Sequence, residues 1–380
     1  LKDTKTILFG FFDFPETYEL NILPILAGNK TQKLLIGASF YNICFTPKAF
    51  EWYASPMFAP FRVKSIHTAI AGNAGININF AAFSETFKQF SLQTSFKKYA
   101  YDNIYKTEPD IISWGALNSK LIYTFEQNPS KPNQKTSIEL KTIQSLTNVS
   151  DLKSFNILEI KSKNDRIIHP YSFNFAIEQA EGFVKSHIDF NYKLTIYKKN
   201  KGIEFRAFAG KFLYNSPEYY GNYNFRLAGN IGLQDYKYEH IFVARGEDIR
   251  QDASAFWTHQ FVRNDGGFVS YTPVGQSNDW LTSANLTFNT PVPMFHVFLN
   301  MATWSGINKN DANRLFAYEA GIELRFLKDF CSIYFPLAIS NDIMEANKIY
   351  FKKYFERVRF TLNLELLNPL LHRDKIPYLI

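Results

Sequence analysis

The seven histidines of this chain are the residues with the most obvious capacity for chemistry. No two of them have the H-E-x-x-H spacing of a zinc hydrolase, and none lies near a cysteine. A Ser–His hydrolase with His187 or His259 as the general base is conceivable, but no orienting partner follows at a readable spacing. The sequence therefore predicts no catalytic residue, no cofactor and no metal site.

Two glycine-rich stretches could suggest ligand-binding loops. Residues 71–75 resemble a phosphate loop only superficially, because Ile76, Ile78 and Phe80 continue an alternating pattern. Asp265-Gly266-Gly267 lacks the other carboxylates of an EF-hand, so a turn is expected there. Neither a G-x-S-x-G elbow nor a Walker loop is present.

A larger group of charged residues shares the polar phase of predicted strands. In a membrane barrel an Arg or Lys facing lipid at the midplane costs about 2–4 kcal/mol, so such side chains are expected to face the lumen. Both signs are present, which permits ion pairs that plug the lumen; a hydrophilic pore is the alternative. Glu178 belongs to this phase, and the lumen-facing candidates are Glu204, Arg206, Arg226, Glu319, Glu323, Arg325, Arg357, Arg359 and Glu365.

The elements that must position these residues are strands with one apolar and one polar face. Successive side chains of a strand point to opposite faces, and the alternation is clear in Arg357–Leu366, where Val358, Phe360 and Leu362 are apolar. The same pattern predicts strands over His187–Tyr197, Gly221–Leu233 and Leu315–Phe326, with further strands over Tyr238–Ala244 and Phe256–Phe261. About ten residues per strand is the length of a transmembrane β-strand, and roughly 16 to 18 strands are expected.

Three prolines and one short helical pattern are exceptions to the regular strand pattern. Pro24, Pro56 and Pro336 lie inside strand patterns, so those strands are either bulged or begin at the proline. Ile343–Ala346 could form a short helical turn inside a longer connection.

The composition agrees with a barrel. The 380 residues include 38 Phe, 22 Tyr and 5 Trp, while the mean hydropathy is only −0.22. No run approaches the roughly 18 apolar residues of a membrane helix, whereas a barrel hides its membrane signal in alternation. Aromatic residues near strand ends would suit the girdles at the two membrane interfaces.

The net charge and the two cysteines give less information about the fold and the partners of the chain. The net charge of +7 is best explained by lysines on turns, with phosphate-bearing lipid head groups as the alternative partner. Nucleic acid is not indicated, because the basic residues are dispersed. Cys44 and Cys331 lie in apolar patterns and are expected to be free thiols that are buried or face lipid.

The chain also resembles a known family. The run Leu23–Asn29, residues 35–38, Pro47–Phe50 and Ser55–Phe58, together with Gly72–Phe80, Asp265–Phe268 and Trp280–Asn285, is similar to the carboxy-terminal barrel region of Bacteroidota M1-peptidase-like outer-membrane proteins. In that family a gluzincin-like periplasmic domain precedes the barrel, and its zinc motif is missing here. The resemblance therefore implies a barrel without catalytic residues, joined in a longer protein to an amino-terminal periplasmic domain.

These observations predict an all-β fold: a single transmembrane antiparallel β-barrel over residues 1–380. The expected location is the bacterial outer membrane, in contact with lipid and lipopolysaccharide and with other outer-membrane or periplasmic proteins. The expected role is a non-catalytic membrane anchor or structural subunit. A transport pore with a polar lumen and a soluble all-β binding protein are the alternatives.

Overall fold

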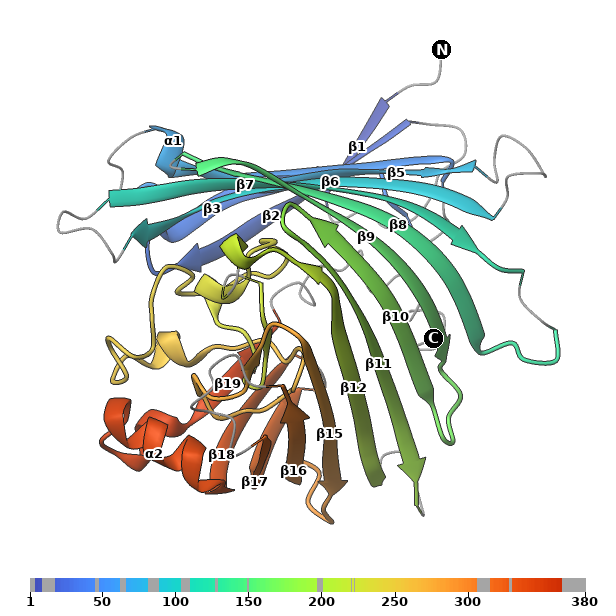
Figure 1. Ribbon diagram of the computed structural model, residues 1–380. Coiled ribbons are helices and arrows are strands. Elements are labelled where there is room, and N and C mark those ends of the chain that lie inside the picture. The colour runs from blue at the N-terminus through green and yellow to red at the C-terminus, as the bar shows by residue number, and fades with distance from the viewer. Residues whose placement is uncertain are drawn as a thin grey trace.

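A single large β-sheet dominates the computed structural model, which describes residues 4–8, 18–44, 48–61, 66–80, 89–103, 110–126, 129–148, 150–196, 201–219, 221, 223–305, 315–327 and 330–363 (Figure 1). The sheet has 17 strands. They are β1 (Thr4–Leu8), β2 (Tyr18–Asn29), β3 (Lys33–Tyr41), β4 (Phe50–Phe58), β5 (Ile70–Asn79), β6 (Phe90–Asn103), β7 (Asp110–Thr124), β8 (Gln134–Thr147), β9 (Ser150–Asn164), β10 (Tyr171–Ala180), β11 (Phe183–Thr195), β12 (Gly202–Asn215), β15 (Trp280–Asn289), β16 (Phe295–Trp304), β17 (Phe316–Leu327), β18 (Cys331–Ile339) and β19 (Arg359–Leu362).

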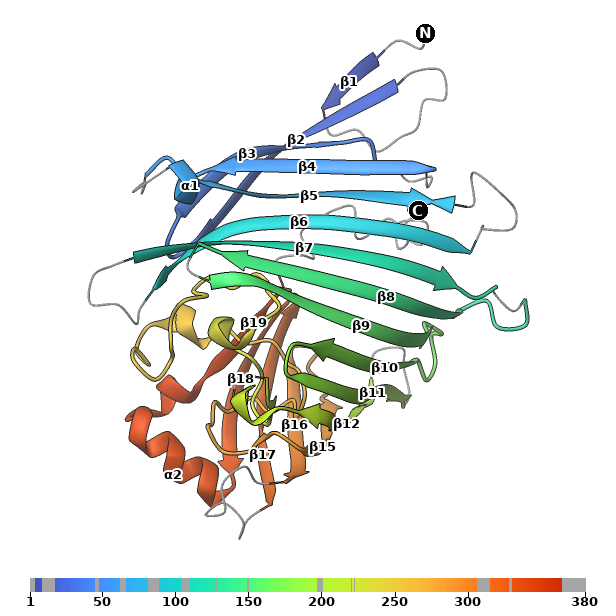
Figure 2. The same cartoon turned by 45° about the horizontal axis from the view of Figure 1, so that its top comes forward.

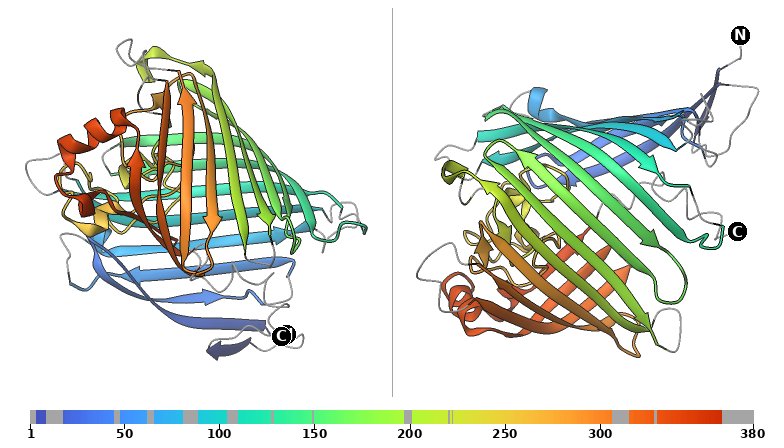
Figure 3. Two further views of the ribbon diagram at one scale, coloured as in Figure 1. Left: turned by 90° about the horizontal axis from the view of Figure 1, so that it is seen from below. Right: turned by 45° about the vertical axis from the view of Figure 1, so that its right-hand side comes forward.

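Each strand from β2 to β19 in this series pairs antiparallel with the next one along the chain, so the sheet is an uninterrupted meander. Only β1 differs, because it pairs parallel with β2. Sixteen strands are therefore antiparallel, the seventeenth being β1. The predicted all-β fold with one antiparallel sheet of 16 to 18 strands is confirmed. Figures 2 and 3 show how the sheet curls around an inner space.

Burial along the strands is the reverse of that in a water-soluble sheet. On β17 the side chains of Glu319 and Glu323 are 0% and 1% exposed, whereas Phe316 is 56% exposed. On β16 the alternation places Asn300 inside and Val297 outside. On these two strands the charged and amide side chains thus face the enclosed space, whereas Phe316 and Val297 face outward.

Three predicted wall strands are wrong. Gly221–Leu233 contains only the short strand β13 (Phe225–Arg226), which pairs with β14 (Gln276–Ser277) apart from the large sheet. Tyr238–Ala244 is a series of turns and Phe256–Phe261 is mostly a 3-10 helix, η5 (Phe256–His259). All three ranges belong to the connection between β12 and β15, and it enters the enclosed space. There Phe225 and Leu227 are fully buried against the wall, so their alternation reflects packing between layers.

The predicted strand Arg357–Leu366 is also shorter than expected. Only Arg359–Leu362 is extended as β19, because the 3-10 helix η7 (Tyr354–Arg357) takes up its beginning, and residues from 364 onward lie outside the described part of the chain. The predicted helical turn is confirmed within α2 (Asn341–Tyr350). A second short helix, α1 (Ile66–Ala69), precedes β5.

The outer edges of β2 and β19 are each covered over part of their length by another segment of the chain. β1 covers the start of β2 as far as Ile22, and Pro24 follows where that cover ends. On β19, the carbonyl of Phe360 accepts a hydrogen bond from the amide of Phe261 (2.9 Å). The register shifts beside Pro336, as expected for a bulge.

Candidate functional site

The connection between β12 and β15, residues 216–279, is the structural feature that decides how the lumen can function. It folds back inside the curled sheet at one end (Figures 1 and 3). We call it the inner segment. Phe225, Leu227 and Phe268 of this segment pack against Phe208 and Phe212 of the wall. An apolar core thus lies between the inner segment and the sheet.

Arg245 organises the centre of the inner segment. Its guanidinium donates to the carboxylate of Asp235 (2.7 Å) and to the carbonyl of Gly232 (3.2 Å). It also lies 4.9 Å above the ring of Trp114 on β7 and 4.7 Å from the ring of Tyr238. Asp235 in turn accepts the amide of His240 (3.0 Å), so the turn 235–240 is held in one conformation.

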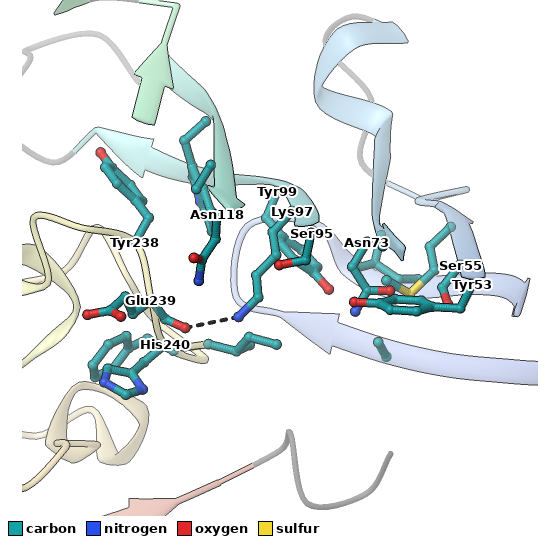
Figure 4. A pocket seen from close by; sticks show the side chains of 18 of the residues that line it. Tyr53, Ser55, Asn73, Ser95, Lys97, Tyr99, Asn118, Tyr238, Glu239 and His240 are labelled. Atoms are coloured by element: carbon teal, nitrogen blue, oxygen red, sulfur yellow. Dashed lines mark hydrogen bonds between the residues drawn. The ribbon is translucent and has the colours of Figure 1, made fainter. Parts of the chain in front are cut away.

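That turn presents Glu239 to the wall (Figure 4). Its carboxylate forms an ion pair with Lys141 of β8 and a second with Lys237 (3.2 Å). Its carbonyl accepts a hydrogen bond from Lys97 of β6 (3.0 Å). Although burial alone would raise the pKa of Glu239, Lys237 and Lys141 hold it well below its usual value. Glu239 is therefore an ionised tie between the inner segment and the wall.

A second tie reaches β10. The carboxylate of Glu178 accepts hydrogen bonds from Tyr236 (2.5 Å) and Lys237 (3.0 Å). Lys185 of β11 donates to the Tyr236 hydroxyl (2.9 Å). Burial and the neighbouring Glu178 carboxylate raise the pKa of the Tyr236 phenol well above its usual value, so this group stays a donor.

A third tie involves two of the predicted lumen residues. Glu319 accepts the backbone amides of Val269 (2.5 Å) and Ser270 (2.9 Å). Arg359, which is fully buried, donates to the carbonyl of Val269 (2.8 Å) and lies 4.4 Å from the ring of Phe261. Both side chains thus bind the inner segment rather than line open water.

Four other predicted lumen residues form ion pairs on the inner side of the wall. Glu204 of β12 and Glu323 and Arg325 of β17 form one ion-pair network on the inner side of the sheet, with Arg325 donating to both carboxylates. Arg206 pairs with Asp189 and donates to the carbonyl of Asp265 (2.9 Å).

Two of the remaining candidates, Arg226 and Arg357, do not lie on the wall. Arg226 belongs to the inner segment, and burial lowers its pKa. Arg357 lies in η7 and donates to the Met344 sulfur (3.3 Å). Glu365 lies outside the described residues.

Two cavities flank the inner segment. The larger, about 860 Å³, is lined by the inner faces of β2 to β8, and the smaller, about 540 Å³, by those of β10 to β12. Lys237, Glu239 and His240 line both, so the turn that carries Glu239 separates them. The larger cavity is also lined by four residues that are absent from the predicted lumen set, although the three lysines occupy the polar phase of their strands: Lys97, Lys120, Lys141 and Glu239.

The two histidines considered as general bases, His187 and His259, make structural contacts. His259 has both ring nitrogens against backbone carbonyls, those of Val358 (2.5 Å) and Ala253 (2.7 Å), and His187 stacks near Phe208. Within the described ranges, no group of three potential metal ligands occurs, and no helix is long and apolar enough to cross a membrane. Both cysteines are free, Cys44 buried and Cys331 partly exposed.

Comparisons with known proteins give structural similarity only. No protein-family model and no curated protein sequence matches the chain. CdiB from Acinetobacter baumannii is similar with a TM-score of 0.42 and 10% identity, over 87% of this chain and 60% of that one. CdiB from Escherichia coli gives 0.45 and 12%, over 87% and 63%. BamA from Haemophilus ducreyi, lacking POTRA domains 1–3, gives 0.47 and 11%, over 88% and 71%.

The chain spans about three fifths of the length of the two CdiB structures. Similarity at these scores assigns no activity, so the function is argued from the side chains of this chain.

Proposed function

We propose that this chain is an integral β-barrel of the bacterial outer membrane, serving as a non-catalytic anchor or structural subunit. The observation that carries the proposal is the inverted burial of its strands. Glu319, Glu323 and Arg359 are at most 1% exposed, whereas Leu26, Leu213 and Leu337 are at least 60% exposed. In water such an outer face would be a large unfavourable apolar surface, whereas a bilayer solvates it. This distribution also argues against a soluble binding protein.

The inner segment supports a closed lumen. Charged or hydrogen-bonded ties join it to β6, β8, β10, β17 and β19, so it is attached around much of the wall. Buried ion pairs of this kind are costly to break, because separation leaves uncompensated charges. We therefore expect the inner segment to block the flow of water and ions through the lumen at this end.

Loop lengths indicate an orientation. The two longest connections, 216–279 and 340–358, lie at one end of the sheet, which also carries the short turns 30–32 and 181–182, so the orientation rests on these two connections. Outer-membrane barrels carry short turns on the periplasmic side and longer loops outside. The inner segment would then close the extracellular end, and lipopolysaccharide would surround it. Periplasmic or other outer-membrane proteins would meet the opposite end, and the resemblance to M1-peptidase-like proteins supports such a partner domain.

A transport pore is the second candidate, favoured by one observation. The two cavities meet at the single turn carrying Glu239, so a shift of that turn would join them. Here the inner segment would act as a gate.

Conductance in planar lipid bilayers distinguishes the two candidates. Flotation of the same proteoliposomes in a density gradient first establishes that the protein is inserted. The anchor predicts a sealed trace for inserted protein, and stepwise currents in the unmodified protein would show a pore instead. Monodisperse protein in buffer without detergent would contradict the membrane location itself.

A further inference from the structure

Lys120 of β7 is the centre of a polar row on the inner wall. The strand registers place Asn77, Gln93, Lys120 and Lys141 directly beside one another on β5, β6, β7 and β8. All four line the cavity of about 860 Å³. Two ammonium groups thus stand directly opposite each other, an arrangement that destabilises a sheet unless an anion balances it.

The neighbouring charges are balanced, but that of Lys120 is not. Lys141 pairs with Glu239. The carboxylates nearest to Lys120 on the wall, Glu139 and Glu159, are both bridged by Lys161 at 2.8 and 2.7 Å. In the described part of the chain, Lys120 itself makes neither a hydrogen bond nor an ion pair, so its positive charge faces the cavity.

Other polar groups converge on the same place. Asn118 lies on the same face of β7, opposite Ser95, and its buried Oδ1 has no hydrogen-bond partner within the described residues. Lys97 lies on the next polar position of β6 (Figure 4). Of the other cations that line this cavity, Arg245 pairs with Asp235 and Lys237 pairs with Glu178, so their charges are balanced from outside the cavity.

We propose that this cavity binds a small phosphate ester that carries hydroxyl groups, with Lys120 holding the phosphate. An ammonium group binds phosphate as a point charge, and a ligand hydroxyl would satisfy the acceptor of Asn118. The volume lies within the range of small-molecule sites, about 300–1,000 Å³. Binding goes beyond the proposed anchoring role and is independent of whether the lumen conducts.

The test is calorimetric titration of the detergent-solubilised full chain with glycerol 3-phosphate, with glycerol as the uncharged counterpart. One ligand per chain is expected to bind, and glycerol is not. Lys120→Gln should weaken binding about tenfold or more, because it removes a charge-assisted hydrogen bond. Lys120→Arg should retain binding, and Lys131→Gln, on an exposed turn, should leave it unchanged.

Folding is not expected to confound the result, because Lys120→Gln removes a like-charged pair. Failure of the unmodified chain to bind either glycerol 3-phosphate or its acylated form, or equal affinity in Lys120→Gln, would overturn the site. Lysophosphatidic acid, an acylated form of glycerol 3-phosphate, tests whether the phosphate comes from a soluble ester or from a lipid. Binding of lysophosphatidic acid but not of glycerol 3-phosphate would overturn the proposal of a soluble ligand and assign the cavity to a lipid head group.

Discussion

Replacing Glu239 by Gln should loosen the turn 235–240 of the inner segment from the wall. The carboxylate lies between Lys141 and Lys237, and the Gln side chain keeps the shape but not the charge. Loss of one partner from a buried ion pair costs about 3–5 kcal/mol. The lower end applies here, because Glu178 still neutralises Lys237 and the Glu239 side chain is 23% exposed. A loss of about 3 kcal/mol raises the displaced population roughly 100-fold.

The assay counts opening events per inserted protein in planar bilayers at neutral pH. Unmodified protein is expected to be silent, and Glu239→Gln should show transient steps. Glu218→Gln is the matched control, since Glu218 is an exposed carboxylate of the same segment. Limited proteolysis provides a second readout, with cleavage in residues 237–243 expected only for Glu239→Gln. A silent, protease-resistant Glu239→Gln protein would refute the idea that this ion pair closes the lumen.

Three further predictions concern the outer face, a glycine turn and pH. Ile188→Arg, at a 41% exposed position on the outside of β11, should destabilise the barrel in lipid by about 2–4 kcal/mol, measured by urea unfolding in vesicles, whereas Ile167→Arg in an exposed turn should have little effect. Gly267→Ala should lower the free energy of unfolding by at least 1–2 kcal/mol in the same assay, because its φ is +70° and a Cβ would lie 2.6 Å from the Arg206 side chain. Gly221→Ala, with open space around it, should lower the stability less. Equal losses of stability in the two variants would contradict this reasoning. The pKa of Glu239 is lower in the folded protein than the unfolded value of about 4.3, so its ion pairs stabilise the fold fully above pH 4.3 and are lost only as the pH falls through the lower folded pKa. The lumen should therefore still be closed at pH 5. Openings at pH 5 would argue against the lowered pKa.

The sequence predicted most of the wall but not the inner segment. The predicted strand Leu315–Phe326 forms β17 with its bounds shifted by one residue, because a strand needs only the local alternation of side chains. The Gly221–Leu233 pattern looks the same but packs inside the sheet. Its apolar phase contacts the wall core around Phe208, and no local signal distinguishes an inner layer from the wall.

The candidate site was predicted in part for the same reason. Glu319 and Arg359 were recognised as inward-facing from strand phase, yet their partners at Val269 and Ser270 are distant in sequence. The row that aligns Lys120 with Lys141 depends on strand register, and Glu239 reaches Lys141 only because the inner segment folds back.

The sequence by itself thus determined the strands and which of their faces is polar, because side-chain alternation has a period of two residues and is local to each strand. Only the tertiary structure decided that the inner segment folds back into the space enclosed by the sheet and contacts its polar side chains. Register, enclosure and the pairing of buried charges all arise from contacts between segments far apart in the chain.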